Sequence, residues 1–186
     1  MKYYELKVAG LTRQLPIIPI SGDLAIASFV LLGDQEMTTA AAKYLDKILP
    51  KVDGLMTAEA KGIPLVNELA RIRNISHYVV ARKSTKVYME NPLMVEVDSI
   101  TTKNPQKLYL DQKDVERIQG KRIALVDDVI STGESLLAME MLAKEAGAAV
   151  VAKGAILAEG KATQREDIIY LEELPLFYLN GNSMVE

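Results

Sequence analysis

The residues best suited to chemistry lie together in the stretch 122–135. An apolar run, 123–126, leads into the adjacent carboxylates Asp127 and Asp128, and a hydroxyl-rich turn with a central glycine follows at 131–135. The apolar run is typical of a buried strand in a parallel sheet, which presents ligand-binding groups at its carboxyl end. The turn predicts a loop whose backbone N–H groups bind an anion, at the positive end of the next helix. We expect a phosphate there, with vicinal hydroxyls or hydrated Mg²⁺ facing both carboxylates.

A purely structural interpretation of the same residues is also possible. Asp127 and Asp128 would then cap the loop, and Ser131 and Thr132 would cap the following helix. For an isolated strand followed by two aspartates, the two interpretations are about equally good. The complete spacing, in which the glycine-containing turn and the helix follow in order, favours the ligand site.

The elements that must position these residues alternate between strand and helix patterns. Two prolines interrupt the segment 84–106, which has no sustained helical period and is either a long loop or a weak hairpin with 94–97 as one arm. The alternation predicts an α/β fold, with a mainly parallel central sheet flanked by helices. We expect strands or edge segments at 2–9, 15–20, 54–57, 78–81, 108–110, 123–126, 149–152, 155–158 and 174–179, and helices at 34–49, 64–73 and 134–146.

Length and composition restrict the function classes. A chain of 186 residues is expected to form a single domain, here 1–186. The net charge of -3 argues against a nucleic-acid or membrane-surface partner. The chain has no cysteine and one histidine, which excludes thiolate chemistry and sites that need two imidazoles. Because the sequence shows neither a signal peptide nor an apolar run of about 20 residues, we expect a cytoplasmic protein.

Residues 124–135 resemble the phosphoribosyl-diphosphate signature of the type I phosphoribosyltransferases. The resemblance implies that Asp127 and Asp128 act at the catalytic centre and hold the ribose 2′ and 3′ hydroxyls. It also implies Mg²⁺, which arrives with the substrate and reaches the two aspartates through water. A second glycine is common in the family where Glu134 stands. The residues expected around the 5-phosphate are Ser131, Thr132, Gly133, Glu134 and Ser135.

Two further segments are similar to adenine phosphoribosyltransferases. Residues 57–63 resemble the turn that binds pyrophosphate through backbone amides and a basic residue, with Lys61 where that subfamily usually has arginine. Residues 81–83 resemble the basic pair after the next strand, although a solvated basic cluster would explain them equally well on their own. The pyrophosphate ligands implied are Glu59, Ala60, Lys61, Gly62, Arg82, Lys83 and Lys86. The same resemblance implies a small hood at about 1–32 and a mobile lid at 84–106.

The implied reaction is a substitution at the ribose anomeric carbon. A base nitrogen would displace pyrophosphate, which makes the chain a glycosyltransferase of purine salvage that acts on phosphoribosyl diphosphate as a homodimer. Adenine is favoured as the base, and xanthine or guanine is the alternative. Two features depart from the adenine subfamily. The lid stretch 99–102 lacks the glutamate of that subfamily, and Glu96 and Asp98 are close but not at the matching position. The hood stretch 24–28 lacks the expected aromatic residue and arginine.

Two other classes of protein remain open. Some bacterial regulators keep this fold and sense phosphoribosyl diphosphate without catalysis, usually with the help of a DNA-binding segment or a basic RNA-binding face. A general α/β phosphate-binding protein with a coincidental motif is the other alternative.

Overall fold

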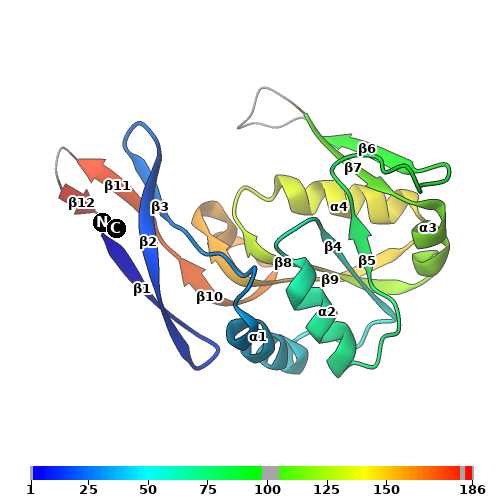
Figure 1. The fold of residues 1–186 in the computed structure, drawn as a ribbon, viewed down its shortest axis with the longest axis horizontal. Coiled ribbons are helices and arrows are strands. Elements are labelled where there is room, and N and C mark those ends of the chain that lie inside the picture. The colour runs from blue at the N-terminus through cyan, green and yellow to red at the C-terminus, as the bar shows by residue number, and fades with distance from the viewer. Residues whose placement is uncertain (1, 98–104, 181–182, 186) are drawn as a thin grey trace.

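The computed structural model describes residues 2–97, 105–180 and 183–185, and it contains a parallel sheet, an antiparallel hood and a hairpin (Figure 1). The parallel sheet has the order β10-β9-β8-β4-β5 and comprises β4 (Gly54–Ala58), β5 (Val79–Ala81), β8 (Arg122–Ile130), β9 (Ala149–Glu159) and β10 (Ile169–Leu174). The hood has the order β1-β2-β3-β11-β12 and comprises β1 (Tyr3–Val8), β2 (Leu11–Ser21), β3 (Leu24–Ala27), β11 (Leu176–Asn180) and β12 (Ser183–Val185). Strands β6 (Leu93–Val97) and β7 (Gln106–Leu110) form the antiparallel hairpin.

Helices cover both faces of the parallel sheet. Helices α1 (Gln35–Ile48) and α2 (Ile63–Ile72) lie on one face, and α4 (Glu134–Glu145) lies on the other, below the β6–β7 hairpin in Figure 1. The 123–126 segment of β8 has no exposed surface because both faces are covered, which explains its uninterrupted apolar sequence. The predicted fold class, a parallel sheet flanked by helices with a small hood, is confirmed.

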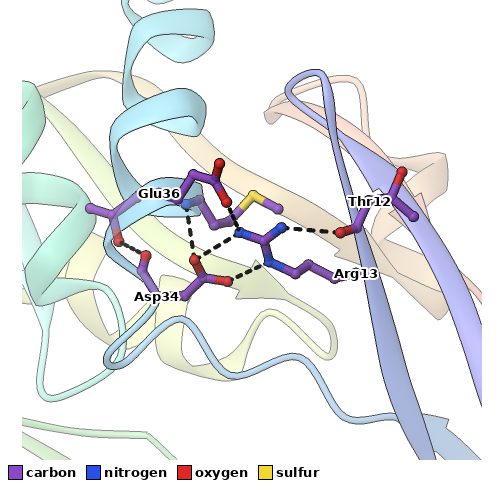
Figure 2. A network of polar contacts seen from close by, with 6 residues as sticks. Thr12, Arg13, Asp34 and Glu36 are labelled. Atoms are coloured by element: carbon purple, nitrogen blue, oxygen red, sulfur yellow. Dashed lines mark hydrogen bonds and ion pairs between the residues drawn. The ribbon is translucent and has the colours of Figure 1, made fainter.

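The hood is joined to the sheet domain by a polar contact at the start of α1. Asp34 accepts a hydrogen bond from the Met37 N–H at 3.0 Å, which makes it the predicted N-cap. Arg13 of β2 donates to both carboxylate oxygens of Asp34, at 2.7 and 3.0 Å, and to Glu36 at 2.8 Å (Figure 2). The guanidinium therefore fixes the hood against the first turn of this helix.

Several elements differ from the sequence predictions. Strand β8 continues through the two aspartates to Ile130, and β9 is one strand in which Gly154 leaves room for the Leu49 side chain. Helix α3 (Gln112–Ile118) and strand β10 were not predicted, because a seven-residue helix and a mixed-polarity edge strand lack a clear period. The hood also includes β11 and β12 from the end of the chain.

The segment expected as a lid loop is partly ordered structure. Strand β6 pairs with β7, and Val95 and Val97 are buried against the core beside α4, so 93–97 is one arm of a packed hairpin rather than loop. Residues 98–104, which include Asp98 and the 99–102 stretch, lie outside the described residues. No helix in the described part of the chain is long and apolar enough to cross a membrane.

Candidate functional site

The predicted ligand-binding residues converge at the carboxyl edge of the parallel sheet. Strand β4 pairs with β5 on one side and with β8 on the other, so the strand order reverses between β4 and β8. Ligands bind α/β sheets at such a switch point, outside the carboxyl ends of the strands. The turn 59–62 follows β4, the basic cluster 82–86 follows β5, and the loop 131–135 follows β8.

The two aspartates occupy different environments. Asp128 is 1% exposed, and its Oδ2 lies 3.0 Å from Lys61 Nζ, an ion-pair distance without the alignment of a hydrogen bond. Asp127 lines a pocket beside the 131–135 loop and accepts the Asp128 N–H at 2.9 Å. In this conformation Lys61 covers the Asp128 carboxylate, so the expected contact of Asp128 with a ligand requires Lys61 to turn away and stays a prediction.

The acidity of Asp127 reflects this crowding. Burial and, after it, the neighbouring charge of Asp128 raise the pKa of Asp127 to about 7, while Lys61 acts in the opposite direction. A buried carboxyl next to a second one is stabilised by hydroxyl donors or a cation. The arrangement therefore favours a polyhydroxylated or cation-bearing ligand.

The loop 131–135 has the geometry of an anion site. It borders a pocket of about 150 Å³ at the N-terminus of the 12-residue helix α4. Gly133 has φ +82, a left-handed conformation that favours glycine. The N–H groups of Gly133 and Ser135 donate to no acceptor within the described residues, as expected for the first turn of a helix. They are available to a phosphate.

The turn 59–62 lies against β8 because it contains a glycine. A Cβ on Gly62 would overlap Thr57 Oγ1 and lie 3.0 Å from Asp127 Oδ1. The Glu59 N–H already donates to the Ala81 carbonyl at 2.9 Å, so it is engaged in this conformation. The N–H groups of Ala60, Lys61 and Gly62 have no acceptor among the described residues and are available to an anion.

The basic cluster lies beside that turn and is organised by Glu59. The Glu59 carboxylate accepts from Arg82 Nε and from the Lys83 N–H, both at 2.6 Å. Burial alone would raise the pKa of Glu59, but these donors hold it below its usual value. Arg82 also donates to the Tyr88 hydroxyl at 2.9 Å, and Lys86 Nζ contacts Ser84 Oγ at 2.7 Å. The structure thus brings all the predicted pyrophosphate residues together.

Three residues near the site were not assigned a role from sequence. Gln106 of β7 lines the pocket of the 131–135 loop. Arg165 forms two hydrogen bonds to Asp167, at 2.8 and 2.7 Å, and its Nη1 would lie 2.6 Å from a Cβ on Gly133. Glu159 ends β9, and burial raises its pKa. Their neighbours come from distant segments, so no local pattern indicates them.

The residues that could meet a metal are the two adjacent carboxylates. No group of three or more His, Cys, Asp or Glu side chains converges within the described residues. Two carboxylates without a third ligand suit a hydrated Mg²⁺ that is already bound to an anionic substrate, rather than a metal cage built by the protein. The lid carboxylate Glu96 forms an ion pair with Lys107 at 3.1 Å, away from this pair.

The chain is similar in sequence and in fold to known proteins. The sequence model of a family described as phosphoribosyl transferase domain matches residues 32–176. The hypoxanthine/guanine phosphoribosyltransferase of Methanotorris igneus is 34% identical over 134 residues, which cover 72% of this chain and 67% of that protein. That of Methanococcus voltae is 32% identical over 135 residues, and the alignment spans only 65% of its length.

Two other matches differ in kind. A probable purine biosynthesis transcriptional regulator of Streptococcus pneumoniae is 29% identical over 139 residues, and the chain spans half of its length. The crystal structure of adenine phosphoribosyltransferase from Thermoanaerobacter pseudethanolicus superposes with a TM-score of 0.69 at 22% identity, covering 86% of this chain and 95% of that one. This last match supports the fold.

Proposed function

Since the chain belongs to the phosphoribosyl transferase family, we propose that it transfers the 5-phosphoribosyl group of phosphoribosyl diphosphate to a purine base and releases pyrophosphate. The observation that carries the proposal is the meeting of a carboxylate pair, an anion loop and a second amide-rich turn at one switch point. In that substrate the ribose lies between the 5-phosphate and the diphosphate, and here Asp127 borders the 131–135 loop on one side and the 59–62 turn on the other.

Each group has a defined task in this proposal. Asp127 and Asp128 hold the ribose hydroxyls, and the N–H groups of 131–135 bind the 5-phosphate. Lys61 is 49% exposed, so it can turn from Asp128 to the diphosphate, where the 59–62 amides and the basic cluster stabilise the departing negative charge. Mg²⁺ carried by the diphosphate fits the two carboxylates and would neutralise further charge. The base nitrogen then needs only to be positioned in line with the leaving group.

The acceptor we propose is a 6-substituted purine, with adenine first and guanine, hypoxanthine or xanthine as alternatives. Adenine is supported by the similarity of 57–63 and 81–83 to the adenine subfamily, whereas the relatives of similar sequence include hypoxanthine/guanine enzymes. Glu159 ends β9 next to Gly160, where a Cβ would touch the hood residue Leu176 at 3.0 Å. A carboxyl group at this junction would accept a hydrogen bond from an exocyclic amino group, which adenine and guanine both carry.

The test is nucleotide formation from phosphoribosyl diphosphate, Mg²⁺ and each base in turn. We expect product with at least one purine, and a loss of roughly 10²-fold or more in the Asp127→Asn/Asp128→Asn variant because the ribose loses its position. Glu145→Gln, exposed at the C-terminal end of α4, removes a charge outside the site and is the control, which should leave the rate unchanged. A preference for orotate or uracil over every purine would contradict the proposed acceptor.

A sensor of phosphoribosyl diphosphate is the second candidate, supported by the similarity to the streptococcal regulator. The same phosphoribosyl site would serve such a protein. Tight binding of phosphoribosyl diphosphate in calorimetry, together with no nucleotide from any base, would favour the sensor. Homodimer formation and a cytoplasmic location remain predictions for either function.

A further inference from the structure

Gln106, the first residue of β7, is placed unusually for a surface hairpin. Its side chain lines the same pocket of about 150 Å³ as the 131–135 loop. Its Oε1 atom is buried and has no hydrogen-bond partner among the described residues. Buried polar atoms nearly always have a partner, so an unpaired one inside a ligand pocket indicates a partner that arrives with the ligand.

The charges of this pocket make a neutral donor important. The lining that the described residues provide includes the carboxyls Asp127 and Glu134 but no lysine or arginine. Within this lining, an anion meets backbone N–H groups, hydroxyls and any amide within reach, while Arg165 lies beside Gly133 outside the lining. In that lining, Gln106 is the side-chain amide, and it comes from an element other than the loop itself.

The position of Gln106 is set by packing rather than by a free loop. Gln106 pairs with Val97 across the hairpin, and Leu108 and Leu110 of the same strand are buried in one apolar cluster with Leu136 and Met139 of α4. Helix α4 is also the helix whose N-terminus carries the 131–135 loop. The amide and the loop are thus held by the same packed unit.

We propose that the Gln106 carboxamide is a further ligand of the 5-phosphate, and that the phosphate thereby joins the β6–β7 hairpin to the N-terminus of α4. A half-turn about the Cγ–Cδ bond places the NH₂ group where Oε1 now stands, so that it donates to a phosphate oxygen. The inference deepens the proposed function, because it rests on a phosphoribosyl group occupying this pocket.

Calorimetric titration with ribose 5-phosphate and with inorganic pyrophosphate tests this. Gln106→Glu keeps the size of the side chain but turns a carboxylate toward the phosphate, and we expect the affinity for ribose 5-phosphate to fall about tenfold or more. Gln106→Leu, which removes the donor without adding charge, should lower it by a smaller factor. The affinity for pyrophosphate should not change in either variant. Gln35→Glu, exposed at the start of α1, adds the same charge far from the pocket and is the control.

The outcomes separate this inference from the proposed function. Unchanged binding of ribose 5-phosphate by Gln106→Glu overturns the inference, and so does an equal loss of both ligands, which would indicate a general effect on folding. Wild-type protein that binds ribose 5-phosphate but forms no nucleotide refutes the proposed catalysis, while a selective loss in Gln106→Glu still supports this ligand.

Discussion

Replacing Gly62 with alanine tests whether the two ligand-binding segments depend on their close approach. Gly62 has φ -74, which any residue adopts, so the substitution introduces no backbone strain. The cost is steric: the new Cβ would overlap Thr57 Oγ1 and lie 3.0 Å from Asp127 Oδ1 and 3.3 Å from Asp127 Cα. Thr57 is fully buried in β4, and the Asp127 backbone is held in β8, so neither neighbour can easily move away.

Overpacking of this kind costs about 1–3 kcal/mol. For a chain of this size, we expect the unfolding midpoint of Gly62→Ala to fall by roughly 2–4 °C per kcal/mol. Relief of the overlap must push the 59–62 turn away from Asp127, so the affinity for phosphoribosyl diphosphate should also fall, by up to roughly 10²-fold if the displacement approaches 1 Å. Thermal denaturation and calorimetric titration of the same samples measure both effects.

Two variants make this prediction specific. Gly154→Ala is the matched control, because its Cβ would meet only the flexible end of the Leu49 side chain, at 3.0 Å and far from the site. Thr57→Ala removes the overlapping oxygen, so the double variant Thr57→Ala/Gly62→Ala should lose less stability than the sum of the two single losses. If Gly62→Ala keeps both its midpoint and its affinity, and the double variant shows no coupling, the reasoning from close approach is refuted.

Three more substitutions test other parts of the structure. The pKa of Asp127 is raised from 3.8 to about 7, so the folded state binds the proton more tightly and the wild-type protein loses stability as pH rises from about 4 to 7. Asparagine stays neutral, so in urea titrations Asp127→Asn should be more stable than wild type at pH 8 but not at pH 4. Asp34→Ala removes a helix N-cap and the partner of Arg13, so the free energy of unfolding should fall by about 1–2 kcal/mol in the same assay, and no loss would show that the cap is dispensable. In Gly133→Ala, the new residue has a strained φ of +82 and its Cβ meets Arg165 at 2.6 Å. Calorimetry should show that this variant loses affinity for ribose 5-phosphate relative to wild type and keeps its affinity for pyrophosphate.

The residues of the proposed phosphoribosyl half of the site could be grouped from sequence because they are local. Strand β8, the carboxylate pair and the loop 131–135 follow one another within one segment, so their types and spacing carry the chemistry. The turn 59–62 and the cluster 82–86 are local in the same way. Only the parallel sheet was needed to infer that these segments meet at one edge.

What sequence reasoning missed depends on contacts between distant segments. Gln106 lies 25 or more residues before the loop whose pocket it lines, and Arg165 reaches Gly133 from beyond β9. A glutamine before a strand and an arginine within an Arg-Glu-Asp run read as ordinary surface residues. The burial of Asp128 was likewise invisible, because it depends on how Lys61 folds back over the strand.

The proposed site has a phosphoribosyl half at the parallel sheet and a base half at the hood. This division explains why the base is harder to infer than the reaction. The family match covers residues 32–176, whereas hood strands β1, β2 and β3 end at Ala27 and β11 begins at Leu176. The matched region thus contains the carboxylate pair, the 131–135 loop and the 59–62 turn, but almost none of the hood. In the hood, Ile18 pairs with Ile26, and Ile26 pairs with Leu176, which reaches Gly160 beside Glu159. Directly opposed residues share a face of a sheet, so this apolar row faces the junction where the base is expected. If the base binds at this junction as proposed, its choice depends on residues from both ends of the chain, which lie almost entirely outside the matched region.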